Sequence, residues 1–185
     1  ITNREEQLNA LSQMLFQADK ALKISKLITR ANFKADSEDR LVNVAAYINQ
    51  YLAIYGEIMS NSKVEIVSNV GDLKFERMVS VLDISVIIDN LISNSQKANA
   101  NKVEFDAELT PNNELKIIVS DNGNGLEEQF LSMPDSIFEL GVTSTDGSGI
   151  GLYTIKNCLE EIGGTIKFAG NGQKMKGASF VIIIP

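Results

Sequence analysis

Apolar residues recur at helical spacing in four stretches of the chain. In residues 1–30 they form a short coiled-coil-like stripe, made of Leu8, Leu11, Leu15, Ala18 and Leu22. This stripe fits either a helix packed on its own domain or a helix through which two copies dimerise, and both interpretations stay open. The other three stretches, each typical of a helix, cover residues 44–59, 82–98 and 150–162.

Shorter apolar runs bounded by turn residues predict five strands, at residues 63–70, 102–109, 114–120, 165–169 and 178–184. A Pro-Asn-Asn turn at 111–113 indicates an antiparallel hairpin between the second and third of them. The chain has more strands than a parallel sheet could join, because each parallel pair needs a long crossover connection, usually a helix. The expected fold class is therefore α/β: a two-layer α/β sandwich whose mixed, mostly antiparallel sheet carries helices on one face. An N-terminal helix in residues 1–36 precedes this domain, which spans residues 37–185.

Composition narrows the chemistry that the domain can perform. The 185 residues are 44% hydrophobic and 22% charged, as in an ordinary globular domain. The chain has 17 Lys and Arg against 24 Asp and Glu, and its net charge is −7. It therefore lacks the excess of positive charge with which proteins bind DNA or RNA. The chain has no histidine and a single cysteine, Cys158, which excludes a catalytic histidine within the chain, a Cys-rich zinc site and an internal disulfide. An anionic ligand would therefore be held by local cations, backbone amides or a metal ion.

The sequence contains no targeting or membrane-spanning segment. Its longest apolar run, Phe180–Ile184, is far too short to cross a bilayer, and no signal-peptide pattern stands at the N-terminus. Because the chain begins at Ile1 rather than Met, we expect it to be a piece of a longer protein. The expected location of this piece is the cytoplasm, whether or not the parent protein is anchored in a membrane.

The helix at residues 82–98 carries a polar face beside its apolar one. At about 100° per residue, Asn90, Asn94 and Lys97 share this face at positions i, i+4 and i+7. An asparagine carbonyl is a hard oxygen ligand that suits Mg²⁺, and a lysine one turn further on can meet a phosphate. Surface polar residues without any ligand would give the same helical pattern, so the helix alone does not establish a site.

Two glycine-rich segments add further candidate chemistry. The strand at 114–120 leads into Asp-Asn-Gly-Asn-Gly at 121–125, where the carboxylate can accept a hydrogen bond from an exocyclic amine and the glycines let the backbone approach a planar ring. Residues 147–152 then open the helix at 150–162, and amides at a helix N-terminus form a natural phosphate cradle. The first segment lacks the spacing of a calcium-binding loop, and the second lacks that of a dinucleotide-binding motif. Residues 172–179 have the glycine spacing of a P-loop, but they carry Ala178 where the lysine must be and precede a strand rather than a helix.

Taken in order, these segments resemble the ATP-binding domain shared by DNA gyrase, heat-shock chaperones, histidine kinases and MutL-type ATPases. Among these, the chain is most similar to the catalytic domain of a sensor histidine kinase. The matching segments are the N box at 89–97, the glycine boxes at 121–125 and 147–152, the F box at 137–141, and the closing strands at 163–166 and 177–180, ending at Pro185. The resemblance covers about residues 40–185.

The resemblance implies a role for each matching position. Asn94 would coordinate Mg²⁺, Asn90 would lie near the phosphates, and Lys97 would meet a phosphate oxygen, which makes Asn90 and Lys97 the expected catalytic residues. Asp121 would bind the adenine amino group, and residues 134–148 would form a lid over ATP. The full set of implied nucleotide contacts is Asn90, Asn94, Lys97, Asp121, Gly123, Gly125, Thr143, Ser148, Gly149, Ile150, Gly151, Leu152 and Ser179.

The implied function is the catalytic domain of a two-component sensor histidine kinase, which binds Mg-ATP or ADP and donates the γ-phosphoryl group to a histidine outside this chain. The implied partners are the histidine-bearing dimerisation segment of the parent protein, a response regulator and, through residues 1–30, a second copy of the chain. Two alternatives are a non-catalytic nucleotide-sensing module and an ATPase switch of the gyrase or MutL kind.

Three features distinguish the chain from some of these relatives. Hydrolytic members of the superfamily carry Glu at position 90 to take a proton from water, which Asn90 cannot do, and this favours the kinase over the ATPase switch. The lid stretch 139–148 has no Lys or Arg, whereas many kinases place a cation there. Ala98 stands where an aromatic residue or histidine is common.

Overall fold

The computed structural model describes residues 39–58, 64–142 and 149–185. The chain divides into two units, Ile1–Glu38 and Asp39–Pro185, and the second unit contains all of the described helices and strands. The predicted N-terminal helix, with its apolar stripe, lies outside the described residues. The predicted division of the chain into residues 1–36 and 37–185 stays a prediction.

A five-stranded sheet forms one layer of the domain. Its strand order is β2-β4-β5-β7-β6. The strands are β2 (Glu65–Asn69), β4 (Lys102–Leu109), β5 (Leu115–Asp121), β6 (Thr165–Asn171) and β7 (Ala178–Ile184). The pair β2 and β4 is parallel, whereas the other three neighbouring pairs are antiparallel. The predicted mixed, mostly antiparallel sheet is therefore confirmed.

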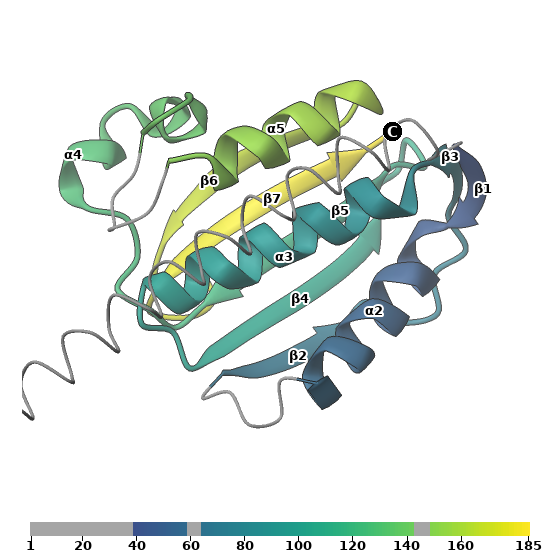
Figure 1. Ribbon diagram of the computed structural model, residues 1–185, viewed down its shortest axis with the longest axis horizontal. Coiled ribbons are helices and arrows are strands. Elements are labelled where there is room, and N and C mark those ends of the chain that lie inside the picture. The colour runs from purple at the N-terminus through teal and green to yellow at the C-terminus, as the bar shows by residue number, and fades with distance from the viewer. Residues whose placement is uncertain (1–38, 59–63, 143–148) are drawn as a thin grey trace, which may run out of the picture. The chain divides into compact units, whose positions relative to one another are not determined.

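Three helices form the second layer. They are α2 (Val44–Ile58), α3 (Val81–Lys97) and α5 (Gly151–Glu161), and all three lie on the same face of the sheet (Figure 1). The core between the layers is apolar. In it, Ile92 and Leu159 from the helices and Phe105 and Ile182 from the strands are all buried. The two-layer sandwich predicted from the sequence is confirmed.

Two short strands beyond the main sheet were not predicted. β1 (Arg40–Asn43) pairs antiparallel with β3 (Glu76–Val79). Each has four residues, and half of their side chains are exposed, so neither shows an apolar run in the sequence. β3 leads directly to Ser80, whose hydroxyl caps α3 by accepting a hydrogen bond from the amide of Asp83 at 3.3 Å.

The long glycine-containing segment between β5 and α5 also has structure of its own. It contains α4 (Glu128–Leu131) and the 3₁₀ helix η1 (Pro134–Phe138). Phe138 of η1 is buried, and its ring meets Phe180 of β7 edge-on, which anchors this segment to the sheet. No helix in the described part of the chain is long and apolar enough to span a membrane.

Candidate functional site

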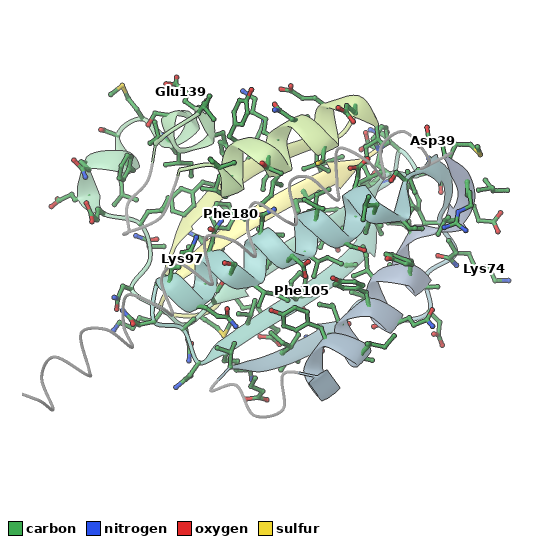
Figure 2. All side chains as sticks on the ribbon, viewed as in Figure 1. Asp39, Lys74, Lys97, Phe105, Glu139 and Phe180 are labelled. Carbon is green, nitrogen blue, oxygen red and sulfur yellow. The ribbon has the colours of Figure 1, made fainter. Side chains whose placement is uncertain are left out.

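One pocket brings together the sequence segments that were singled out for their chemistry. It lies between the C-terminal part of α3, the loop after β5, the first residues of α5 and the start of β7. Figure 2 labels Lys97 near the end of α3 and Phe180 on β7, both of which line it. The lining residues are Asn94, Lys97, Ala98, Asp121, Gly125, Leu126, Phe130, Ile137, Val142, Gly149, Gly151, Leu152, Ala178 and Phe180.

Asn90 and Asn94 face the first residue of α5. A Cβ atom added at Gly151 would lie 3.2 Å from the Oδ1 atoms of both asparagines, so glycine lets the helix start close to these two oxygens. Asn90 is oriented by its Nδ2, which donates to the carbonyl of Val86 at 2.8 Å. The Nδ2 of Asn94 is buried and has no hydrogen-bond partner among the described residues. Buried polar atoms are normally hydrogen-bonded, so the Nδ2 of Asn94, unpaired within the described part of the chain, is a group that can contact a ligand.

The N-terminus of α5 is the second polar feature of the pocket. Ile150 precedes it without a side-chain cap, and Gly149 has a φ of 64° that suits glycine. The first amides of a helix lack partners within the helix and carry its positive end, so they can bind an anion. Lys97, at the end of α3, adds a positive charge to the same pocket.

Asp121 is the carboxylate of the pocket, and it is only 4% exposed. Its Oδ1 accepts hydrogen bonds from the amides of Gly123 at 2.8 Å and Ala178 at 3.3 Å. Its Oδ2 accepts one from the hydroxyl of Ser95 at 3.1 Å. These donors fix the orientation of the carboxylate, and because an ionised carboxylate has about four lone-pair sites, capacity remains to accept a proton donor of a ligand.

The backbone packs closely around Asp121. A Cβ at Gly177 would overlap Oδ1 of Asp121, and the Gly177 amide donates to the Asp121 carbonyl at 2.9 Å. On the other side, a Cβ at Gly123 would lie 2.6 Å from the carbonyl oxygen of Ala98. Gly123 therefore packs under the end of α3 and shapes the pocket from behind, whereas Gly125 lines it directly.

Several expected nucleotide contacts either lie outside the described residues or do not line the pocket. Thr143 and Ser148 lie outside the described residues. Ile150 is 37% exposed and is not among the lining residues. Ser179 points to the opposite face of the sheet, because side chains alternate along β7 and Ala178 and Phe180 face the pocket. The Ser179 hydroxyl is instead buried at 2.9 Å from that of Ser120 on β5.

The sequence did not reveal some of the residues that line the pocket or support its carboxylate. Ser95 follows Asn94 directly, and nothing in the helical pattern indicates that it reaches Asp121. The apolar wall of the pocket comes partly from Phe130 of α4 and partly from Ile137 and Val142 of the expected lid segment. A hydrogen bond of 3.1 Å from the amide of Gly141 to the carbonyl of Gly149 joins the two sides of this segment.

Comparisons with known proteins show what the chain is similar to. The family model "Histidine kinase-, DNA gyrase B-, and HSP90-like ATPase" matches residues 80–185. The chain is 26% identical over 190 residues to a probable C4-dicarboxylate sensor kinase of Bacillus subtilis, and the match covers 92% of this chain and 33% of that protein. It thus spans about a third of that relative's length.

Solved structures show the same fold. The catalytic domain of the histidine kinase ThkA matches with a TM-score of 0.66 and 19% identity, covering 80% of this chain and 95% of that one. Full-length ShkA in complex with AMPPNP matches with a TM-score of 0.64 and 20% identity, covering 80% of this chain and 31% of that one. The family match spans more than half of the chain and contains the two asparagines, Lys97 and Asp121. The chain therefore belongs to the family of histidine kinase-, DNA gyrase B- and HSP90-like ATPases, as an ATP-binding catalytic domain of the histidine kinase type.

Proposed function

We propose that this pocket binds Mg-ATP and that the domain donates the γ-phosphoryl group to a histidine outside the chain. The observation that carries the proposal is that Asn94, Lys97, Asp121 and the first residues of α5 line the same pocket. The pocket has one end suited to a base with an exocyclic amine and another suited to phosphates. ShkA, which shares the fold, is known in complex with AMPPNP.

Each polar group takes a part in binding. Asp121 accepts a hydrogen bond from the adenine amino group, and its three protein donors keep the carboxylate in the required orientation. The amides at the start of α5, beside Gly149 and Gly151, hold the phosphates together with Lys97. The apolar side chains Leu126, Phe130 and Ile137 exclude water from the base.

The Oδ1 of Asn94 is the proposed protein ligand of Mg²⁺. No group of three or more Asp, Glu, Cys or His side chains within residues 39–58, 64–142 and 149–185 could cage a metal ion. A single protein oxygen, the Oδ1 of Asn94, fits Mg²⁺, because this ion usually keeps several waters and binds through few protein ligands together with phosphates. When bound, the ion neutralises charge on the transferring phosphoryl group. Asn94 has a buried Nδ2 without a partner among the described residues, which fits a residue that completes its contacts with the ligand.

Phosphoryl transfer fits Asn90 better than hydrolysis does. A carboxamide is not a base, so the Asn90 side chain cannot take a proton from water. A histidine acceptor brings its own nucleophilic nitrogen. Since the chain has no histidine, the acceptor belongs to another segment. The proposed partners are thus a histidine-bearing dimerisation segment of the parent protein and a response regulator, with the domain in the cytoplasm.

Calorimetric titration with ADP tests nucleotide binding. We expect Mg²⁺-dependent binding by the wild-type chain and a loss of about 5- to 150-fold in Asp121→Ala, since an unpaired amine costs about 1–3 kcal/mol. Asp72→Ala, which removes an exposed carboxylate in the β2–β3 connection, is the matched control and should bind as the wild type does. Equal affinity of Asp121→Ala and wild type would refute the adenine assignment.

Incubation of the full-length parent protein with labelled ATP tests the transfer. Acid-labile, base-stable label that disappears in Asn94→Ala supports the kinase. A second candidate is the nucleotide-sensing module, which is favoured by the absence of Lys and Arg from residues 139–148. That candidate predicts intact ATP binding and no label under any condition.

A further inference from the structure

Asn171, the last residue of β6, is joined to the loop after β5 through both ends of its side-chain amide. Its Oδ1 accepts a hydrogen bond from the amide of Leu126 at 2.9 Å, and its Nδ2 donates to the carbonyl of the same residue at 2.8 Å. The side chain thus pairs with the backbone of Leu126 as a neighbouring strand would. We name these two hydrogen bonds the Asn171 clamp.

The clamp lies directly behind the wall of the pocket. Gly125 and Leu126 both line the pocket, and a Cβ at Gly125 would lie 2.6 Å from the Oδ1 of Asn171. Gly125 also has a φ of 73°, which favours glycine. The absence of a side chain at this position therefore lets the loop approach Asn171 closely enough for both hydrogen bonds to form.

The loop has few other fixed points. Residues 122–127 belong to no helix or strand. Near its start, the side chain of Asn122 accepts from the amides of Asn101 and Lys102, and further on the amide of Asn124 donates to the carbonyl of Ala98 at 2.8 Å. The Asn171 clamp is the next attachment along the chain, and it comes just before the segment that leads into α4 and the lid.

The other side of the clamp is equally well anchored. Gly172 and Gly177 close the β6–β7 hairpin with a hydrogen bond of 3.0 Å, and the Gly177 amide binds the carbonyl of Asp121. At the tip of the hairpin, Lys174 forms ion pairs with Asp106 at 2.6 Å and Glu104 at 3.3 Å. Asn171 therefore ties an irregular loop to a hairpin that is itself fixed to the backbone of Asp121.

We propose that Asn171 is a positioning residue for the nucleotide: it holds Gly125 and Leu126 against the bound base without touching the reacting atoms. The proposal rests on the proposed nucleotide-binding function. If the clamp is lost, Gly125 and Leu126 leave their places in the wall, and the nucleotide loses part of its contact surface.

Asn171→Asp is the sharpest variant, because it keeps the size of the side chain and the acceptor for the Leu126 amide. It replaces the donor with a carboxylate oxygen that opposes the Leu126 carbonyl. We expect the Kd for ADP, measured by calorimetry on the full chain, to rise about tenfold. Gln173→Glu adds the same charge to the exposed part of the same hairpin and is the matched control, with a Kd equal to that of the wild type.

Two further readouts separate positioning from a purely structural role. Amide hydrogen exchange at Leu126 should become faster in Asn171→Asp while exchange in β4 and β5 stays unchanged. In the parent kinase, the KM for ATP should rise while kcat stays the same, since Asn171 touches no reacting group. If Asn171→Asp does not fold, Asn171→Ser, which keeps a small polar side chain but cannot span both groups, replaces it in the same measurements.

The outcomes are distinguishable. Failure of the wild-type chain to bind ADP would overturn the proposed function, and the positioning role with it. Binding by the wild type together with an unchanged Kd in a folded Asn171 variant would overturn the positioning role alone. A lower melting temperature with an unchanged Kd would also overturn it, because it would show that the clamp stabilises the fold and nothing more.

Discussion

Ser95 donates its hydroxyl hydrogen bond to Asp121 across the interior of the domain, with 3.1 Å between Oγ and Oδ2. Both residues are buried, with 5% and 4% of their surfaces exposed. The same hydroxyl lies 3.1 Å from the carbonyl of Leu91. The helix that carries the proposed phosphate and metal contacts thus also supports the carboxylate proposed for the base.

Replacing Ser95 by alanine should destabilise the domain by about 1–2 kcal/mol, because a buried carboxylate loses one of its donors. Ser93→Ala on the same helix is the control, since it makes the same change in helix propensity without touching Asp121. Urea unfolding of both variants measures the difference. Equal stability of the two variants would show that the Ser95 hydrogen bond contributes nothing net.

Gly151→Ala should separate ligand binding from stability. The added Cβ lies 3.2 Å from the Oδ1 atoms of Asn90 and Asn94, so both side chains must move from the proposed Mg²⁺ site. We expect affinity for Mg-ADP to fall about tenfold, whereas stability stays equal or rises because alanine favours a helix over glycine. Gly56→Ala in α2, where a Cβ meets nothing within 4 Å, is the control and should leave Mg-ADP affinity unchanged.

Tyr51 should make the stability of the domain sensitive to alkaline pH. Burial, and then the hydrogen bond from its hydroxyl to Oδ1 of Asp89 at 2.9 Å, raise the pKa of Tyr51 well above its ordinary value of 10.0. The folded state therefore keeps the phenol proton where the unfolded chain loses it. This contribution to stability is fully present below the unfolded pKa and is lost as pH rises from there through the folded pKa.

Tyr51→Phe should accordingly flatten the fall in stability that the wild type shows as the pH rises above about 10. Urea unfolding at several pH values measures the slope, and Tyr153→Phe on α5 is the control. A slope in Tyr51→Phe as steep as that of the wild type would contradict this prediction.

The isolated domain should show negligible ATP hydrolysis. Asn90 cannot act as a base, and its amide is held by the carbonyl of Val86. Phosphate release from ATP measures the turnover. A rate near about 10 s⁻¹, the median for ordinary enzymes, would contradict the kinase proposal and favour an ATPase switch.

Local periodicity was enough to predict the polar residues of the pocket. Asn94 and Lys97 share a face because a long amphipathic helix fixes the direction of every side chain. Asp121 could be predicted because it comes at the end of a strongly apolar strand. The start of α5 could be predicted because glycines precede an amphipathic run. These features depend on neighbours within a few residues, which a sequence displays directly.

The features that were not predicted are contacts between segments far apart in the chain. The periodicity of a sequence carries no information about such contacts. The Asn171 clamp spans 45 residues, and the contact between Ser95 and Asp121 spans 26. β1 and β3 were missed because their cross-strand pair Leu41 and Met78 is exposed, so no apolar alternation marks them. Ser179 is different, because the alternation of Ala178, Ser179 and Phe180 was visible in the sequence and placed its side chain away from the pocket.

The position of β7 within the sheet has a consequence for synthesis of the protein. β7 lies between β5 and β6, although it follows both in the chain, and it supplies Ala178 and Phe180 to the pocket. While a ribosome is still translating the residues before 178, β5 and β6 each have an edge without its final neighbour. Such edges can pair with other chains. The wall of the pocket is thus complete only after β7 has left the ribosome, and a ligand that binds the complete pocket stabilises only the finished domain.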